Sequence, residues 1–135
     1  MLQARRVRRG VAAVELALLI PILAFLLVVA VDWCRIFYCS VTIDNCARNG
    51  ALWASDPYGT VRSQYSTMKA AALADAPNLS PQPKVSSTSG VDSGNSYVDC
   101  TVTYTFTTVT NFPGIQHSTQ LVRTVRVYLA PQMPN

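Results

Sequence analysis

One carboxylate lies inside the most apolar stretch of the chain, and its distance from a glycine is the first pattern that could carry chemistry. Glu15 is the fifth residue after Gly10 and precedes an uncharged run from Leu16 to Val31. An acidic residue costs roughly 2.5–3.5 kcal/mol at the centre of a membrane helix and less near the interface, so it usually has a partner. Either Glu15 meets a positive charge in an assembly, or it only extends its carboxylate to the membrane edge.

Positive charge is concentrated immediately before this apolar run. Residues 1–10 contain four arginines, which are Arg5, Arg6, Arg8 and Arg9. As a helix, residues 11–31 would be about 31 Å long, enough to cross a hydrocarbon core of roughly 30 Å. Because basic residues stay in the cytoplasm, we expect a cytoplasmic N-terminus and an exported domain over residues 32–135. A buried core helix is the alternative, but the chain has no second apolar stretch on which it could pack.

A basic leader, Gly10 and Glu15 together resemble the type IV prepilin cleavage signature. Residues 10–21, GVAAVELALLIP, resemble the TadE-like pseudopilins of the tight-adherence pilus system. The resemblance implies that a membrane aspartyl peptidase removes residues 1–10 by cutting between Gly10 and Val11. Leu16 stands where the major tight-adherence pilins usually carry Tyr, and the chain is longer than those pilins. Both departures favour a minor subunit.

Cleavage would give Glu15 its partner. Val11 becomes the new N-terminus, and its α-ammonium can lie beside the Glu15 carboxylate of a neighbouring subunit. Opposite charges about 4 Å apart attract far more strongly at low dielectric than in water. Removing one member of a buried pair typically costs ~3–5 kcal/mol. Gly10 and Val11 are therefore the expected cleavage site, and Glu15 is the expected assembly residue.

The resemblance also implies a function and a location. It predicts a membrane-anchored minor pseudopilin that is processed by a prepilin peptidase and assembled by helix packing. Its partners would be other pilins or pseudopilins, the inner-membrane assembly platform and membrane lipid. It would prime, cap or assist an adhesive pilus or a secretion pseudopilus, from a single-pass position in the inner membrane or within a surface pilus. The alternative is an unprocessed, membrane-tethered module whose exported domain binds a ligand.

The same helix is expected to continue beyond the membrane as a spine. Residues 32–55 contain no glycine or proline before Gly50, and their apolar residues recur at helical spacing. Pro21 removes one backbone hydrogen bond and predicts a kink, unless it is simply a tolerated membrane proline. A turn at residues 56–59 precedes a second predicted helix over residues 60–75, which Thr60 can cap.

Three strand candidates follow, at residues 84–88, 97–110 and 120–129. The second alternates so that one face is apolar. Its apolar positions are Val98, Cys100, Val102, Tyr104 and Phe106. Residues 111–118 are expected to form a hairpin loop. We therefore predict an α+β, pilin-like fold in which a three-stranded antiparallel sheet over residues 84–129 packs on the helical spine.

The four cysteines lie in the segment predicted to be exported, where disulfides can form. Cys39 and Cys46 are two helical turns apart, about 10 Å, which exceeds the ~7 Å limit for a bridge. Cys100 lies on the face of its strand that must cover the spine. A disulfide between Cys46 and Cys100 is therefore the first expectation, and one between Cys39 and Cys100 is the second. Buried free thiols are the alternative.

Several function classes find no support in the sequence. The chain has 11 Lys and Arg against 7 Asp and Glu, and the excess lies in the leader arginines, so we expect no nucleic-acid partner. No nucleophile, acid–base or phosphate-binding arrangement can be assembled, which predicts neither an enzyme nor a cofactor. The single histidine, His117, is expected in a solvated loop rather than at a metal. Residues 92–95 are interpreted as a turn rather than a calcium loop.

Overall fold

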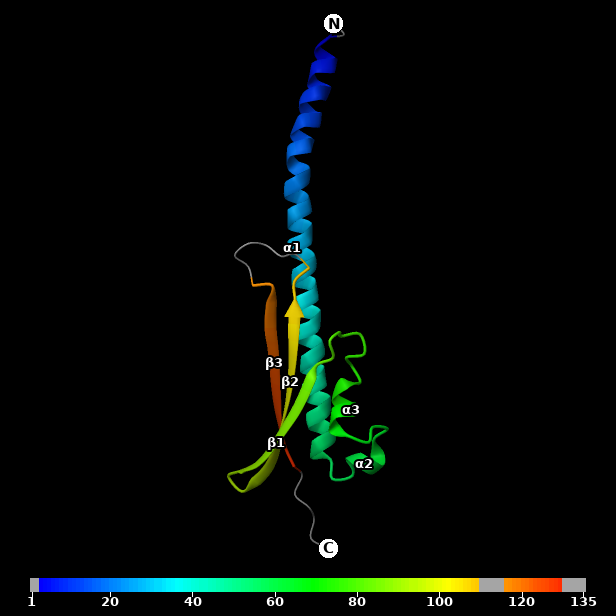
Figure 1. Cartoon of the computed structure of the whole chain (residues 1–135), viewed down its shortest axis with the longest axis vertical. Coiled ribbons are helices and arrows are strands. Elements are labelled where there is room, and N and C mark those ends of the chain that lie inside the picture. The colour runs from blue at the N-terminus through cyan, green and yellow to red at the C-terminus, as the bar shows by residue number, and fades with distance from the viewer. Residues whose placement is uncertain (1–2, 110–115, 130–135) are drawn as a thin grey trace. The chain divides into compact units, whose positions relative to one another are not determined.

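The structure is a computed structural model and describes residues 3–109 and 116–129. Helices and strands follow in the order shown in Figure 1. The elements are α1 (Gln3–Ser55), α2 (Gly59–Arg62), α3 (Met68–Leu73), β1 (Lys84–Asp92), β2 (Asn95–Thr107) and β3 (Ser118–Tyr128). The strands form one antiparallel sheet in the order β1-β2-β3, so the α+β prediction is confirmed.

The chain divides into two compact units, which are described separately. The N-terminal unit ends at Arg35, and the C-terminal unit begins at Ile36. Helix α1 continues through Pro21 and ends at Ser55, where the Ser55 hydroxyl donates to the Leu52 carbonyl at 2.9 Å. Asp56 then accepts a hydrogen bond from the backbone N–H of Tyr58, which turns the chain away from the helix axis.

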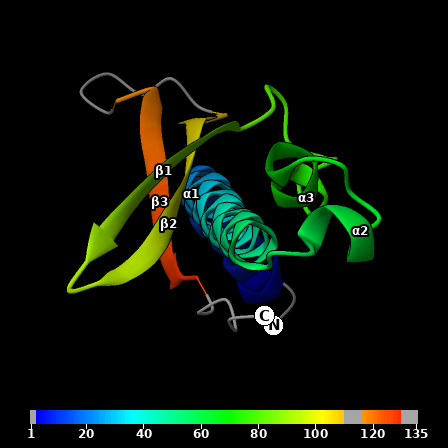
Figure 2. The ribbon, with the colours of Figure 1, turned by 90° about the horizontal axis from the view of Figure 1, so that it is seen from below.

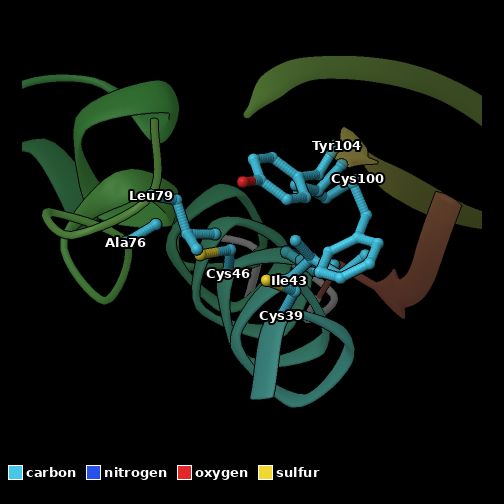
Figure 3. Close-up of a cluster of buried hydrophobic side chains, with 11 residues drawn as sticks. Cys39, Ile43, Cys46, Ala76, Leu79, Cys100 and Tyr104 are labelled. Carbon is cyan, nitrogen blue, oxygen red and sulfur yellow. The ribbon is translucent and has the colours of Figure 1, made fainter. Parts of the chain in front are cut away.

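The core of the C-terminal unit is formed where the last turns of α1 meet the sheet and the segment after α3. The sheet lies on one side of α1, and α2 and α3 lie on the other (Figure 2). Figure 3 shows the buried cluster. Its members are Cys39, Ile43, Cys46, Ala47, Ala51, Ala76, Leu79, Cys100, Val102, Tyr104 and Phe106. The predicted inward face of β2 is therefore confirmed from Cys100 to Phe106, while Val98 is only half-buried.

Gly50 allows three elements to approach closely. A Cβ atom at this position would lie 2.6 Å from the Cys100 Sγ atom and 3.0 Å from the Ala72 Cβ atom. Cβ atoms in proteins essentially never approach a heavy atom within 3.0 Å. The missing side chain of Gly50 is therefore what lets β2 and α3 pack against the same turn of α1.

Strand β1 is longer than the sequence indicates. The pattern favours residues 84–88, whereas the structure pairs every residue from Lys84 to Asp92 with β2. Most β1 side chains are exposed Ser, Thr and Lys, so the alternation of apolar residues ends early although the backbone pairing continues. The predicted turn is confirmed, with Ser93 at φ 51° and Gly94 at φ 84°, both in the left-handed region that tight hairpins use.

The predicted helix over residues 60–75 is two short helices in the structure. Between them, the Ser63 hydroxyl accepts a hydrogen bond from the Tyr65 N–H, a local bond that competes with helix formation. The Tyr65 carbonyl accepts from the Trp53 indole at 3.1 Å, and Thr67 then caps α3 by accepting from the Ala70 N–H. These polar contacts hold residues 63–67 outside either helix. The remaining predicted loop, residues 111–118, lies largely outside the described residues.

Removing the cap of α3 is expected to weaken the C-terminal unit. Thr67→Ala should lower the free energy of unfolding by about 1 kcal/mol, because the Ala70 N–H loses its acceptor at the start of a short helix. Denaturant unfolding of the full chain in detergent measures this loss. Thr67→Ser, which keeps the hydroxyl, and Ser66→Ala, at the exposed neighbouring position, serve as controls. Equal losses for Thr67→Ala and Ser66→Ala would contradict the capping role.

Candidate processing and assembly site

The N-terminal unit places the predicted cleavage and assembly residues along one helix. Gly10, Val11, Glu15 and Pro21 all lie in α1. One window of 18 residues in this helix has a mean hydropathy of 2.9, and none of it is buried inside the structure. By length and composition this helix is sufficient for a single-pass membrane anchor. Water would be a poor solvent for so much exposed apolar surface, so lipid or other helices must cover it.

Gly10 is exposed and has no packing role in the part of the chain that the structure describes. A Cβ atom built on it would meet no atom within 4 Å, in contrast to the crowded Gly50. Helix propensity also disfavours glycine by about 1 kcal/mol relative to alanine. A glycine at this helical position is therefore not explained by the fold of the chain, which is compatible with recognition by another protein.

Glu15 is exposed on α1 and surrounded by apolar positions of its own helix. Residues three and four positions away are its neighbours on the helix surface. They are Val11, Ala12, Leu18 and Leu19, which carry no side-chain charge or hydrogen-bonding group. None of the described side chains next to Glu15 on this helix can therefore pair with its carboxylate.

Further along α1, in the C-terminal unit, large side chains face away from the buried core. Phe37, Tyr38 and Val41 are 72%, 54% and 45% exposed. Phe37 and Val41 are separated by four residues and so share one side of the helix. This exposed side of α1 continues the apolar character of the helix beyond the segment expected to span the membrane.

The structure forms no disulfide among the four cysteines, of which Cys39, Cys46 and Cys100 are buried and Cys34 is exposed. Burial raises the pKa of the Cys46 thiol to about 11, and the charges of Asp75 and Cys100 act in the same direction. Burial also raises the pKa of Cys100. Both thiols are therefore protonated and poorly reactive at neutral pH. The Cys46–Cys100 pairing stays a prediction for the exported protein.

Two arginines of β3 have structural roles that the sequence analysis missed. Arg126 donates to both carboxylate oxygens of Asp99, at 2.8 and 2.9 Å, and lies 3.8 Å from the centroid of the Tyr97 ring. The hydrogen bonds from Arg126 lower the pKa of Asp99. Arg123 donates to the Ser40 hydroxyl of α1 at 2.9 Å. The signal for Arg123 was its position between Leu121 and Val125, because alternate residues of a strand share one face and the two flanking residues are apolar.

The remaining polar candidates have local roles. His117 is exposed, and its ring lies 3.3 Å from the Thr108 hydroxyl. Residues 92–95 form the β1–β2 hairpin turn. Among the described residues, no group of three or more His, Cys, Asp or Glu side chains is arranged to hold a metal ion.

Comparison with protein-family models matches residues 10–52 to the family described as TadE-like protein. The matched segment begins at Gly10, includes Glu15 and ends three residues before α1 does. It covers about a third of the chain and none of the sheet. The resemblance of this helix to the TadE-like proteins is therefore confirmed. Comparison with curated proteins and with solved structures gives no match.

Proposed function

We propose that this chain, which is TadE-like over residues 10–52, is a minor pseudopilin of a tight-adherence pilus, anchored in the membrane by α1. The observation that carries the proposal is the isolated Glu15 carboxylate, five residues after a glycine that the fold does not require. Both residues fall within the matched segment. Cleavage of the leader accounts for Gly10, and a contact between subunits accounts for Glu15. A plain membrane anchor requires neither residue.

Processing supplies the positive charge that the neighbouring positions of Glu15 on its own helix lack. A prepilin peptidase at the cytoplasmic face hydrolyses the Gly10–Val11 peptide bond and leaves an α-ammonium on Val11. Two opposite charges 4 Å apart attract by about 1 kcal/mol in water and about 4 kcal/mol at an effective dielectric constant of 20. A Val11 ammonium therefore binds the Glu15 carboxylate of a neighbouring subunit most strongly when both lie in a bundle of helices.

The helix then determines where the subunit lies. The four leader arginines hold the N-terminus in the cytoplasm before cleavage, and the C-terminal unit is exported. Within the membrane, α1 contacts lipid and the assembly platform. In an assembly, its exposed apolar side chains pack against the helices of other pilins or pseudopilins, which replaces lipid contacts with helix contacts. The subunit primes or caps the filament, and its role is structural rather than catalytic.

Neutralising Glu15 is expected to impair assembly while leaving membrane insertion intact. Glu15→Gln keeps the size of the side chain and removes its charge, so a neighbouring Val11 ammonium would lose its partner. Since breaking such a pair costs ~3–5 kcal/mol, co-purification with other pilus subunits should fall by more than tenfold. Quantitative mass spectrometry of membranes from the native cell measures both insertion and co-purification.

Asp44→Asn is the matched control for the Glu15 variant. Asp44 is another carboxylate of α1, and it is 4.0 Å from Arg48 on the surface of the C-terminal unit. Its loss should leave co-purification unchanged. Normal co-purification of the Glu15→Gln protein would instead support a carboxylate that only extends to the membrane edge.

A further inference from the structure

A cavity of about 350 Å³ lies in the C-terminal unit, beside the last turns of α1. Two aromatic residues, Trp53 and Tyr65, and two acidic residues, Asp56 and Asp75, are among the residues that line it. Its volume is at the lower end of the range of roughly 300–1,000 Å³ in which binding pockets occur. All of its lining residues belong to the C-terminal unit, and neither processing nor helix packing uses them.

The indole N–H of the aromatic wall is already bonded. The Trp53 indole N–H donates to the Tyr65 carbonyl at 3.1 Å, so its hydrogen-bonding capacity is used within the protein. Both rings are half-buried. What Trp53 offers to an occupant is therefore its ring surface, and Tyr65 adds a second ring. The face of an aromatic ring carries a partial negative charge that attracts cations.

The carboxylates give the cavity its charge. Asn49 donates to one oxygen of Asp75 at 2.7 Å, and the Tyr58 N–H donates to one oxygen of Asp56 at 2.8 Å. These bonds hold both side chains in place without neutralising them. No Lys or Arg side chain is among the residues that line the cavity. The cavity thus combines two negative charges with two aromatic rings.

Resting on the proposed function, we propose that this cavity receives a lysine or arginine side chain of a neighbouring protein in the pilus assembly. Such a side chain has the two parts that the cavity complements, since its alkyl stem contacts apolar surface while its cationic head meets carboxylates and ring faces. Leu52 lines the same cavity and is 54% exposed, which offers apolar surface for that stem. A bare metal ion fits less well, because only two of the lining side chains are anionic.

Titration of the full chain with short peptides tests this proposal. The protein is prepared in detergent micelles with Trp33→Phe, which leaves Trp53 as the only tryptophan. The probes are acetyl-Gly-Lys-Gly-amide, acetyl-Gly-Arg-Gly-amide and the same peptide with norleucine in the central position. Norleucine keeps the alkyl stem of lysine and lacks its ammonium group. We expect the two cationic peptides to change Trp53 fluorescence saturably, with dissociation constants of about 1–10 mM, and the norleucine peptide to bind at least threefold more weakly.

Isosteric variants identify the site. Asp56→Asn and Asp75→Asn keep the oxygens that accept the Tyr58 and Asn49 hydrogen bonds, and together they should weaken binding of the cationic peptides by at least threefold. Asp44→Asn changes a carboxylate of α1 that does not line the cavity, so it should leave peptide binding unchanged. Circular dichroism verifies that each variant is folded.

Three results would overturn the proposal. They are equal binding of the norleucine peptide, unchanged binding by the folded double variant, and no saturable response to either cationic peptide. Each of these leaves cleavage after Gly10 and the Glu15 contact untouched, because those are measured at the other end of α1. Failure of the cavity proposal is therefore distinguishable from failure of the proposed function.

Discussion

Gly50→Val is expected to lower the free energy of unfolding of the C-terminal unit by about 3 kcal/mol or more. The new Cβ atom would lie 2.6 Å from Cys100 Sγ and 3.0 Å from Ala72 Cβ, and neither neighbour is the end of a long flexible side chain. Overpacking of a core costs typically 1–3 kcal/mol, and the two methyl groups of valine enlarge the clash. Denaturant unfolding followed by Trp53 fluorescence, in a Trp33→Phe background, measures the loss.

Two further variants separate packing from helix propensity. Asn45→Val introduces the same β-branched residue at an exposed position of α1, where we expect a change within about 0.5 kcal/mol. Cys100→Ala removes the sulfur atom nearest to the new Cβ, so it should partly rescue a Gly50→Ala protein, and the two substitutions should not be additive. Additive losses, or equal losses for Gly50→Val and Asn45→Val, would mean that β2 and α3 do not converge on Gly50.

Gly10→Val is expected to abolish maturation. In the proposed function the peptidase cuts after a small residue, and the β-branched side chain of valine would obstruct its approach to the Gly10–Val11 bond. The leader would then remain attached, and no α-ammonium would form on Val11. Intact-mass analysis of membrane protein from cells that contain the peptidase measures the fraction cleaved, which should fall from nearly complete to nearly none.

Ala17→Val is the matched control for Gly10→Val. It places the same side chain elsewhere on the exposed part of α1, away from the expected cut, and should be processed normally. Normal processing of the Gly10→Val protein would contradict the assignment of the cleavage site, even if the chain is cut at another bond.

The long helix and the inward face of β2 could be predicted because each depends on one local pattern. The apolar run and the absence of glycine and proline between residues 32 and 49 are sufficient for the long part of α1 beyond the leader. Strict alternation is sufficient to direct Cys100, Val102 and Phe106 to the core. Resemblance over residues 10–21 was also sufficient to predict the family later matched over residues 10–52. These features require no knowledge of which elements meet.

The features that the sequence did not reveal depend on contacts between distant residues. Strand β1 extends to Asp92 because β2 pairs with it, not because of its own pattern. The interruption between α2 and α3 depends on the Trp53 indole, which bonds a carbonyl 12 residues away. Gly50 looked like a weak point of a helix, and only the positions of Cys100 and Ala72 give it a packing role.

The candidate cavity also depends on contacts between residues that are distant in the sequence. Trp53 and Asp56 come from the end of α1 and the turn after it, while Tyr65 and Asp75 come from the segments on either side of α3. No spacing along the sequence brings these four side chains together. By contrast, Gly10 and Glu15 are five residues apart on one helix, so their relationship was visible without the fold.

Mass analysis of the N-terminus of the protein isolated from its native membrane tests the central claim most directly. The account predicts a mature chain that begins at Val11, with residues 1–10 removed and a free α-ammonium available to Glu15 of a neighbour. An intact Met1 terminus in cells that contain the peptidase would contradict processing and favour an unprocessed, membrane-tethered module. A mature chain that begins at Val31 would also contradict the account, because the segment that carries Glu15 would then have been removed.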